Sequence, residues 1–390
     1  MIKVGTGISG EIRSERAAEM AALEAVKNAG TRESDLALVF ITTDHNPNFL
    51  QILKTIQSHT GARQIVGSSA YGVLTEKMEI ERSPGIAVMT IQSDKFDTDA
   101  FIFPNFQEDN LECGRETGKR VQGKGYAKNL FCLFADPFSL HGPTFFQGFA
   151  DEAGDTTLIG GLSSEQGTQR MTYQFMNDRV ACDAVAGFLM SGNFRHSSFL
   201  TQSCIPASHP MKITKSDENL IMELNGEPAY DVLLSILDQF EINEYSSLLN
   251  FLFAGLPLVP DQQEFARGNY QVRNIIGLDP EKKIIAIGGP VPANENLVFL
   301  LRDPNLARRD MKEMLEEASN TLTHQQFGFY FSSCGRGMSL YNRSNIDTRM
   351  IREAFPQIPL IGFFTFGEIG PAMGMNMLHN YAGVLTLIGE

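Results

Sequence analysis

The chain has 390 residues, is 43% hydrophobic, and carries 32 Lys and Arg residues against 46 Asp and Glu residues. This length is enough for about two or three domains with cores of their own. A formal net charge of -14 leaves no surplus of basic side chains to neutralise a phosphate backbone, so nucleic acid is not an expected partner.

The sequence also argues against a membrane or secreted protein. Its most apolar stretches, 180–190 and 248–260, are shorter than the ~20 residues that a membrane helix needs, and its first residues contain no apolar core like that of a signal peptide. The five cysteines form no Cys-x-x-Cys pair and are odd in number, which predicts reduced thiols and no zinc site. We therefore expect a cytoplasmic protein.

Four segments have apolar residues at helical spacing, three of them after an Asn or Pro. The predicted helices begin near Asn46, Pro143, Pro228 and Met311. Between them lie short, nearly continuous apolar runs of strand length, which are typical of strands buried on both faces. These runs are 36–41, 86–91, 130–134, 183–190, 297–301, 327–331 and 384–388. The pattern predicts an α/β fold of layered mixed sheets with flanking helices.

Three segments resemble one another. Each has an apolar run and a helix, and then a short strand that opens into a Gly- and hydroxyl-rich turn. The turns are IVGSSAYG (65–72), LIGGLSSEQG (158–167) and LIGFFTFGEIG (360–370). Because all three follow similar helices, we interpret them as internal strand-helix-strand repeats. A stretch rich in Pro and polar residues at 206–228 suggests a boundary, so we divide the chain into modules 1–215 and 216–390.

Several motifs resemble those of the FIST (F-box and intracellular signal transduction) family, with its N-terminal and C-terminal modules. They are the turn at 65–72, ITKSDENLIMELNGEPAYDVL, FYFSSCGRG at 329–337, PLIGFFTFGEIGP at 359–371 and LHNYAGVLTLI at 378–388. The resemblance spans nearly the whole chain and implies a sensory, ligand-binding protein in signal transduction. Family members are suggested to bind amino acids, and some are reported to bind haem and sense nitric oxide. No output domain is expected in addition to the two modules.

Two charged residues stand out in the C-terminal motifs. Arg336 lies between glycines, and its planar guanidinium suits a carboxylate bound through two hydrogen bonds. Glu368 lies in an otherwise apolar run, where a carboxylate needs a cation or hydrogen-bond donors. Arg336 is either a ligand contact, a solvated surface residue or the ion-pair partner of Glu368. As a ligand site, the two residues would bind the two ends of a zwitterion.

The predicted ligand-binding residues surround these two charges in the sequence. They are Ser332, Ser333, Cys334, Gly335, Arg336, Gly337, Thr365, Phe366, Gly367, Glu368, His379 and Asn380. Hydroxyls and turn amides in the N-terminal module repeat the same chemistry without charges, and they either bind anions or close the turns. These secondary positions are Ser68, Ser69, Gly72, Ser163 and Ser164.

Other functions remain open alternatives. Cys334, His379 and Glu368 have the residue types of a Cys-His-acid enzyme. Haem binding needs an axial ligand, and none of the seven histidines has a diagnostic spacing. GTGISG at 5–10 matches a dinucleotide-binding pattern, but the next acidic residue at a predicted strand end is Asp44, well beyond the expected distance of about 20 residues.

The sequence thus predicts a sensor of an amino acid or similar small carboxylate, not an enzyme. No metal and no cofactor are expected, with haem as the alternative. The expected partners are the small-molecule ligand and a downstream signalling protein. An apolar stretch at 248–260 is a candidate contact surface for the latter, although a core strand is its more ordinary use.

Overall fold

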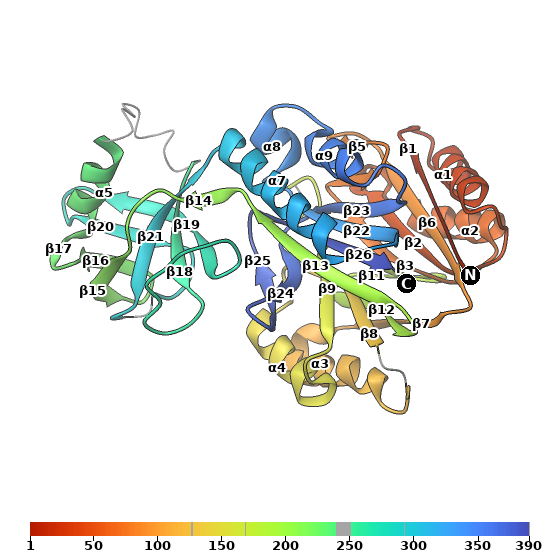
Figure 1. Ribbon diagram of the computed structural model, residues 1–390, viewed down its shortest axis with the longest axis horizontal. Helices are drawn as coiled ribbons and strands as arrows, with labels where there is room; N and C mark the ends of the chain where they lie inside the picture. Colours follow the sequence, from red (N-terminus) through yellow and green to blue (C-terminus); the bar gives the residue numbers. More distant parts are fainter. Residues whose placement is uncertain (126–127, 168, 239–250, 292, 390) are drawn as a thin grey trace. The chain divides into compact units, whose positions relative to one another are not determined.

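The structure is a computed structural model that describes residues 1–125, 128–167, 169–238, 251–291 and 293–389. The chain forms two compact units (Figure 1). The first comprises Met1–Leu200, Met311–Leu378 and Ala382–Glu390, and the second comprises Thr201–Asp310 and His379–Tyr381. The first unit is therefore built from three separate stretches of the chain.

The first sheet of the first unit is flanked by helices α1 (Ser14–Ala29) and α2 (Phe49–Thr60). Its strand order is β1-β6-β2-β3-β10-β11. The strands are β1 (Ile2–Ser9), β6 (Ile86–Ser93), β2 (Ser34–Thr42), β3 (Ala62–Ala70), β10 (Gln174–Met176) and β11 (Arg179–Ala181). Only the β2–β3 pair is parallel.

The second sheet has the order β7-β12-β8-β9-β24-β25 and carries helices α3 (Asn110–Gly118) and α4 (Gly142–Ala153). Its strands are β7 (Phe96–Pro104), β12 (Ala184–Gly192), β8 (Lys128–Ala135), β9 (Thr157–Leu162), β24 (Glu368–Ala372) and β25 (Met375–His379). Here the parallel pair is β8–β9. In Figure 1, α3 and α4 lie together beside these strands.

The third sheet has the order β13-β26-β22-β23-β4-β5, and its parallel pair is β22–β23. Its strands are β13 (Arg195–Gln202), β26 (Ala382–Gly389), β22 (Gln325–Ser333), β23 (Leu360–Thr365), β4 (Gly72–Thr75) and β5 (Glu79–Glu81). The associated helices are α7 (Pro304–Thr321), α8 (Gly337–Tyr341) and α9 (Ile346–Ala354). Three short 3-10 turns complete the unit, at Thr43–His45, Phe106–Glu108 and Lys119–Val121.

These three sheets share one topology, so the first unit consists of three repeats. Each repeat supplies an outer strand and a pair of parallel strands. A further strand lies between the outer strand and the pair, and it runs antiparallel to the adjacent strand of the pair. Each also supplies a hairpin that joins the sheet of another repeat. The hairpin of the first repeat extends the third sheet, that of the second extends the first sheet, and that of the third extends the second sheet. This arrangement confirms the strand-helix-strand repeats predicted from the three similar turns.

A glycine at the same position in each repeat lets the parallel strands pack closely. Gly67, Gly160 and Gly362 lie opposite Val39, Leu133 and Tyr330 in the three parallel pairs. A Cβ atom on these glycines would lie 1.8, 1.9 and 1.6 Å from the carbonyl oxygen of the opposite residue. Only a residue without a side chain fits there.

The residue that follows each of Val39, Leu133 and Tyr330 is a phenylalanine at the centre of the core. Phe40, Phe134 and Phe331 occupy the same place in the three repeats and are fully buried. Their ring centroids are 5.1, 6.1 and 6.4 Å apart, within the range of favourable aromatic contacts. This trio brings the carboxyl ends of the three parallel pairs close together.

The second unit contains a closed sheet. Strands β21, β15, β16, β20, β19 and β18 pair in this order, and β18 pairs with β21 again. The strands of the unit are β14 (Cys204–Pro206), β15 (Met211–Asp217), β16 (Leu220–Leu224), β17 (Glu227–Pro228), β18 (Leu252–Pro257), β19 (Tyr270–Asp279), β20 (Ile284–Ile287) and β21 (Asn296–Arg302). Helix α5 (Ala229–Leu237) contributes buried apolar residues to its core.

All four predicted helices and all seven predicted apolar strands are present. Glycines end α2 and α4, as the sequence indicates. Residues 252–257 of the apolar stretch 248–260 form the mostly buried strand β18, whereas 248–250 lie outside the described residues. The proposed module division at 215/216 stays a prediction, and the compact units divide the chain at 200/201 and 310/311.

The dinucleotide-like GTGISG pattern has a structural explanation. Gly5 and Gly7 lie inside strand β1 and not in a turn between a strand and a helix. A Cβ atom on Gly5 would lie 2.2 Å from the Ala29 nitrogen, and one on Gly7 would lie 2.0 Å from the Ala21 oxygen. Because these contacts are to α1, the glycines permit close packing of the helix on the strand.

Among the helices that the structure describes, none is both long and apolar enough to cross a membrane.

Candidate functional site

A polar residue lies at the carboxyl end of each of the three parallel strand pairs, next to the aromatic core. Thr42, Asp136 and Ser333 each follow the core phenylalanine of their repeat by two residues, and all three are buried. Side chains two residues apart in a strand point to the same face. The three polar side chains therefore lie at the same end of the aromatic trio, where the predicted turns also begin.

The three glycine-rich turns converge here. The Tyr71 N–H donates to Ser164 Oγ at 2.7 Å, and the Ser164 hydroxyl donates to the Phe364 carbonyl oxygen. The Leu162 N–H donates to Gly367 O at 2.8 Å, which joins the second and third turns. The structure thereby unites the secondary positions of the N-terminal module with the turn that carries Glu368.

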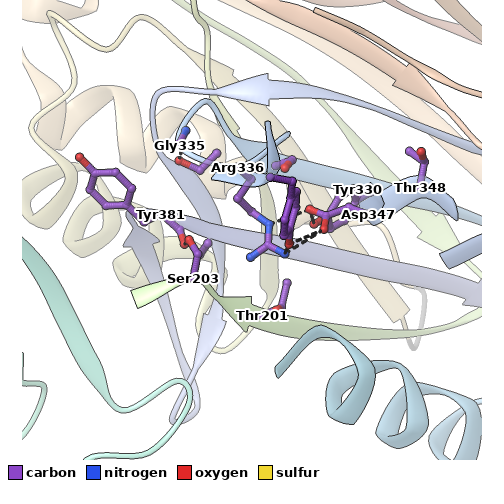
Figure 2. Close-up of polar contacts among 12 residues, drawn as sticks. Thr201, Ser203, Tyr330, Gly335, Arg336, Asp347, Thr348 and Tyr381 are labelled. Carbon is purple, nitrogen blue, oxygen red and sulfur yellow. Dashed lines mark hydrogen bonds and ion pairs between the residues drawn. The ribbon is translucent and has the colours of Figure 1, made fainter. Parts of the chain in front are cut away.

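Arg336 is fully buried and forms an ion pair with Asp347 (Figure 2). Its Nε donates to Asp347 Oδ2 at 2.7 Å and its Nη2 donates to Oδ1 at 3.0 Å. The hydroxyls of Tyr330 and Tyr341 donate to the same carboxylate at 2.8 and 2.9 Å. The expectation of a solvated arginine, or of an ion pair with Glu368, is therefore wrong, because Asp347 is the partner.

Both members of this pair remain charged. Burial lowers the pKa of Arg336, but the Asp347 carboxylate outweighs this effect and raises it well above its usual value. Burial likewise raises the pKa of Asp347, and the Arg336 charge reverses the shift to below the usual range. One guanidinium nitrogen, Nη1, is buried and has no hydrogen-bond partner among the described residues.

Glu368 is fully buried in the turn of the third repeat. Its Oε1 accepts a hydrogen bond from the Thr365 hydroxyl, and its Oε2 accepts one from the Ala382 N–H at 3.0 Å. Burial raises its pKa to about 8, against the opposing effects of these hydrogen bonds and of the Arg336 charge.

Two further acids, the buried Glu79 and the partly buried Glu81, support the same region, and no sequence motif indicated them. Glu81 accepts from the Met338 N–H at 3.0 Å, and Glu79 accepts from the Thr348 N–H at 3.1 Å. Burial raises the pKa of Glu79 to about 7 and that of Glu81 to about 8. Both lie in strand β5, whose short polar sequence has no pattern that would predict burial.

Cys334 has an environment that disfavours a thiolate. It is partly buried, and its N–H donates to Thr365 O at 2.9 Å. Burial raises the pKa of its thiol well above the usual value, whereas nucleophilic cysteines have a lowered pKa. In the adjacent strand end, the buried Ser332 Oγ has no hydrogen-bond partner among the described residues, and Ser333 Oγ accepts from the Gly335 N–H.

The remaining predicted residues have separate roles. Gly337 has a φ of +52°, and a Cβ atom there would lie 2.5 Å from Glu81 Oε1, so no larger residue fits. Phe366 is 37% exposed, and its ring lies against that of Phe138 at 6.5 Å. His379 and Asn380 belong to the second unit, and His379 is buried there.

The secondary positions mostly close turns. Ser69 Oγ accepts from the Tyr173 N–H at 2.9 Å, and Ser163 Oγ accepts from the Gln174 amide at 2.9 Å. Gly72 packs against the Ile80 carbonyl oxygen. Ser68 Oγ is buried and has no hydrogen-bond partner in the described part of the chain. Nor do the described residues include a group of three or more His, Cys, Asp or Glu side chains suited to a metal.

Comparison with protein families assigns both halves of the sequence. The FIST N domain matches residues 35–227, and the FIST C domain matches residues 229–371. The chain belongs to the FIST family. FIST domains are sensory domains of signal transduction.

The relatives of this FIST protein include bacterial chains of the same length. An uncharacterized protein of Mycobacterium tuberculosis is 26% identical over 99% of both chains. One of Mycobacterium bovis is 25% identical over 99% of this chain and 98% of the relative. F-box only protein 22 of Homo sapiens is 42% identical over 55 residues, which is 14% of each chain.

Among solved structures, a cyanuric acid hydrolase from A. caulinodans aligns with 49% of this chain and 71% of its own. The TM-score is 0.28 and the sequence identity is 9%, which are too low to indicate a shared fold.

Proposed function

We propose that this FIST protein is a cytoplasmic sensor that binds an amino acid or a similar small carboxylate at the end of its third repeat. The observation that carries the proposal is a buried guanidinium with one nitrogen lacking an acceptor. A buried donor without a partner costs about 1–3 kcal/mol. Because Asp347 already occupies Nε and Nη2, Nη1 is left to bind a ligand oxygen.

Glu368 is suited to the amino end of such a ligand. The Thr365 hydroxyl and the Ala382 N–H donate to this carboxyl. Its pKa is raised to about 8, because burial outweighs the opposing effects of these hydrogen bonds and of the Arg336 charge. A bound ammonium group would favour the ionised carboxylate and gain a charge-assisted hydrogen bond. Arg336 and Glu368 would then select the two ends of a zwitterion.

One feature of the chain supports a sensor more than a cysteine enzyme. The thiol of Cys334 has a raised pKa, which opposes its use as a nucleophile. All five cysteines are free of disulfides, as suits a reducing cytoplasm. We propose that ligand binding alters contacts with a downstream protein, and that no cofactor is required. Haem remains an alternative ligand, which absorption spectroscopy after haem addition tests separately.

A thermal-shift screen tests the proposal. Each amino acid is compared with the corresponding acid that lacks the amino group and the amine that lacks the carboxylate. A ligand of micromolar affinity has a binding free energy of roughly -8 kcal/mol, and at about 100 times its Kd it stabilises the protein by about 2.7 kcal/mol. We expect at least one amino acid to produce a larger shift than either of its halves.

Two conservative variants assign the contacts. Glu368→Gln imitates the protonated carboxyl and should weaken binding of the amino acid but not of the acid without an amino group. Arg336→Lys keeps a positive charge beside Asp347 but removes Nη1, and it should weaken both. Glu353→Gln, on the exposed side of α9, is the control. If both variants bind a hit as tightly as the control, the ligand lies elsewhere and the proposed site is wrong.

A further inference from the structure

A cavity lies at the end of the first unit's strands opposite to the candidate site. It has a volume of about 320 Å³ and is lined by residues that include Lys128, Arg195 and His196. Lys128 is the first residue of β8, and Arg195 is the first residue of β13. The proposed sensor site lies at the carboxyl ends of strands, so β8 extends from this cavity toward that site.

The cavity concentrates positive charge in an acidic protein. Every described residue that lines it is basic, hydroxyl-bearing or aliphatic, whereas the whole chain has a net charge of -14. Among the described residues, Lys128 and Arg195 have no ion-pair partner. Like charges that share a cavity repel one another, and a bound anion would remove this repulsion.

Hydroxyl groups supplement the cations. Ser197 and Thr323 line the cavity. Thr321 also lines it, but its hydroxyl donates to the Glu317 carbonyl oxygen at 2.8 Å and has no further hydrogen to donate. A guanidinium fork, an ammonium group, an imidazole and two hydroxyls therefore surround one space. This donor set suits a tetrahedral oxyanion with several acceptor oxygens.

We propose that this cavity binds the phosphate group of a small phosphate monoester through Lys128, Arg195 and His196. A phosphate monoester carries about -1.5 to -2 charges and three acceptor oxygens at neutral pH. Small-molecule pockets are usually about 300–1,000 Å³. The volume of about 320 Å³ therefore admits the phosphate with only a small organic group.

The state of His196 agrees with this assignment. Burial and the charge of Lys128 lower the pKa of His196, and a hydrogen bond with the Asn129 backbone opposes them in part. Its ring lies 5.9 Å from that of Phe194, which restrains the imidazole at the cavity wall. A phosphate beside this imidazole would favour its protonated form and add a third cation to the site.

Inorganic phosphate and glycerol phosphate are suitable probes at constant ionic strength and pH. We expect each to raise the melting temperature of the full chain saturably, beyond any effect of chloride. The variant K128A/R195A should bind at least about tenfold more weakly, which is a loss of about 1.4 kcal/mol. The control K54A/R63A removes the same charge from exposed positions outside the cavity and should bind as the parent does.

An NMR measurement locates the binding independently of stability. The imidazole C2 proton of His196, assigned from its loss in His196→Gln, should move saturably with phosphate while that of His59 in α2 does not. Equal binding by K128A/R195A and the control would overturn the proposal. So would a stationary His196 resonance during a saturable thermal shift. Neither outcome depends on amino acid binding at Arg336 and Glu368.

Discussion

The third repeat of the first unit differs from the other two in charge and not in topology. All three have the same strand order, a close glycine contact and a central phenylalanine. At the ends of their parallel pairs, the first and third repeats carry Thr42 and Ser333, and the second carries Asp136. The turn of the second repeat also contains the buried Glu165, whereas the third repeat adds both a buried Arg336 and a buried Glu368.

This difference separates the residues that form the shared fold of the repeats from the charged residues of the candidate site. Burial of a charge is costly unless partners compensate it, and Arg336 obtains its partner, Asp347, from helix α9 of its own repeat. Glu79 and Glu81, in the hairpin that the first repeat contributes to the third sheet, accept hydrogen bonds from backbone N–H groups of α9 and α8. The exchange of hairpins thus makes the charged site of one repeat dependent on another.

The largest expected effect is the pH dependence of stability, which arises from the acids of this site. Above the ordinary Glu pKa of 4.5 and below the folded values near 8, the folded protein binds more protons than the unfolded chain. Stability therefore falls as pH rises through this window. One pKa unit corresponds to about 1.4 kcal/mol, so Glu81 and Glu368 together should cost several kcal/mol by pH 8.5.

Urea unfolding at pH 5.5 and 8.5 measures this loss. Glu368→Gln imitates the protonated carboxyl, because its amide donates to Thr365 and its oxygen accepts from the Ala382 N–H. This variant should lose less stability than the parent between the two pH values. Glu353→Gln, in which an exposed acid of α9 is changed, should follow the parent. Parallel profiles for all three proteins would show that Glu368 is ionised in the folded state.

A substitution of Asp347 should have the next largest effect. Asp347→Ala leaves the buried Arg336 without its carboxylate and the Tyr330 and Tyr341 hydroxyls without an acceptor. Removal of one partner of a buried ion pair costs about 3–5 kcal/mol. Urea unfolding at pH 6 measures this cost, with Glu353→Ala expected to change stability by less than about 1 kcal/mol. A small effect of Asp347→Ala would place Arg336 in water.

Replacing the glycine in the parallel pair of each repeat by alanine should lower the stability of the protein by a similar amount in all three cases. Gly67→Ala, Gly160→Ala and Gly362→Ala each place a Cβ atom within 1.9 Å of a backbone oxygen. Overpacking usually costs about 1–3 kcal/mol, and we expect the upper end because a backbone carbonyl is less able to move. Thermal unfolding of the three variants measures the costs. If one variant were as stable as the parent, the repeats would not share this contact.

The smallest expected effect tests the convergence of the turns. Ser164→Ala removes the acceptor of the Tyr71 N–H and the donor to the Phe364 carbonyl. A buried backbone group left without its partner costs about 1–3 kcal/mol. The variant should also weaken ligand binding, because it loosens the turn before Glu368. Ser58→Ala, in α2, is a control whose binding should be unchanged.

Much of the fold was predictable from local patterns. Apolar runs of strand length predicted β2, β6, β8, β12, β21, β22 and β26, and the Pro, Asn and Gly positions together with helical spacing predicted α2, α4, α5 and α7 but not α1, α3, α8 or α9. The similarity of the three turns predicted the repeats. These features depend on residues close together in the chain, where periodicity and backbone restrictions act directly.

The candidate site was predictable only in part. Arg336 and Glu368 stood out because charges between glycines or within an apolar run require an explanation. Asp347, Glu79 and Glu81 did not, since they occur in ordinary polar segments. Asp347 lies 11 residues after Arg336, and Glu81 is 257 residues before Met338. No local pattern specifies such pairs.

The amino-acid sequence by itself determined the type and position of the main elements, the threefold recurrence and the two unusual charges, because neighbouring residues decide these properties. The tertiary structure alone decided that the three turns meet, that hairpins pass between repeats, and that Arg336 pairs with Asp347. Those outcomes depend on burial and on hydrogen-bond partners distant in the chain, whose energies exist only after the sheets have packed.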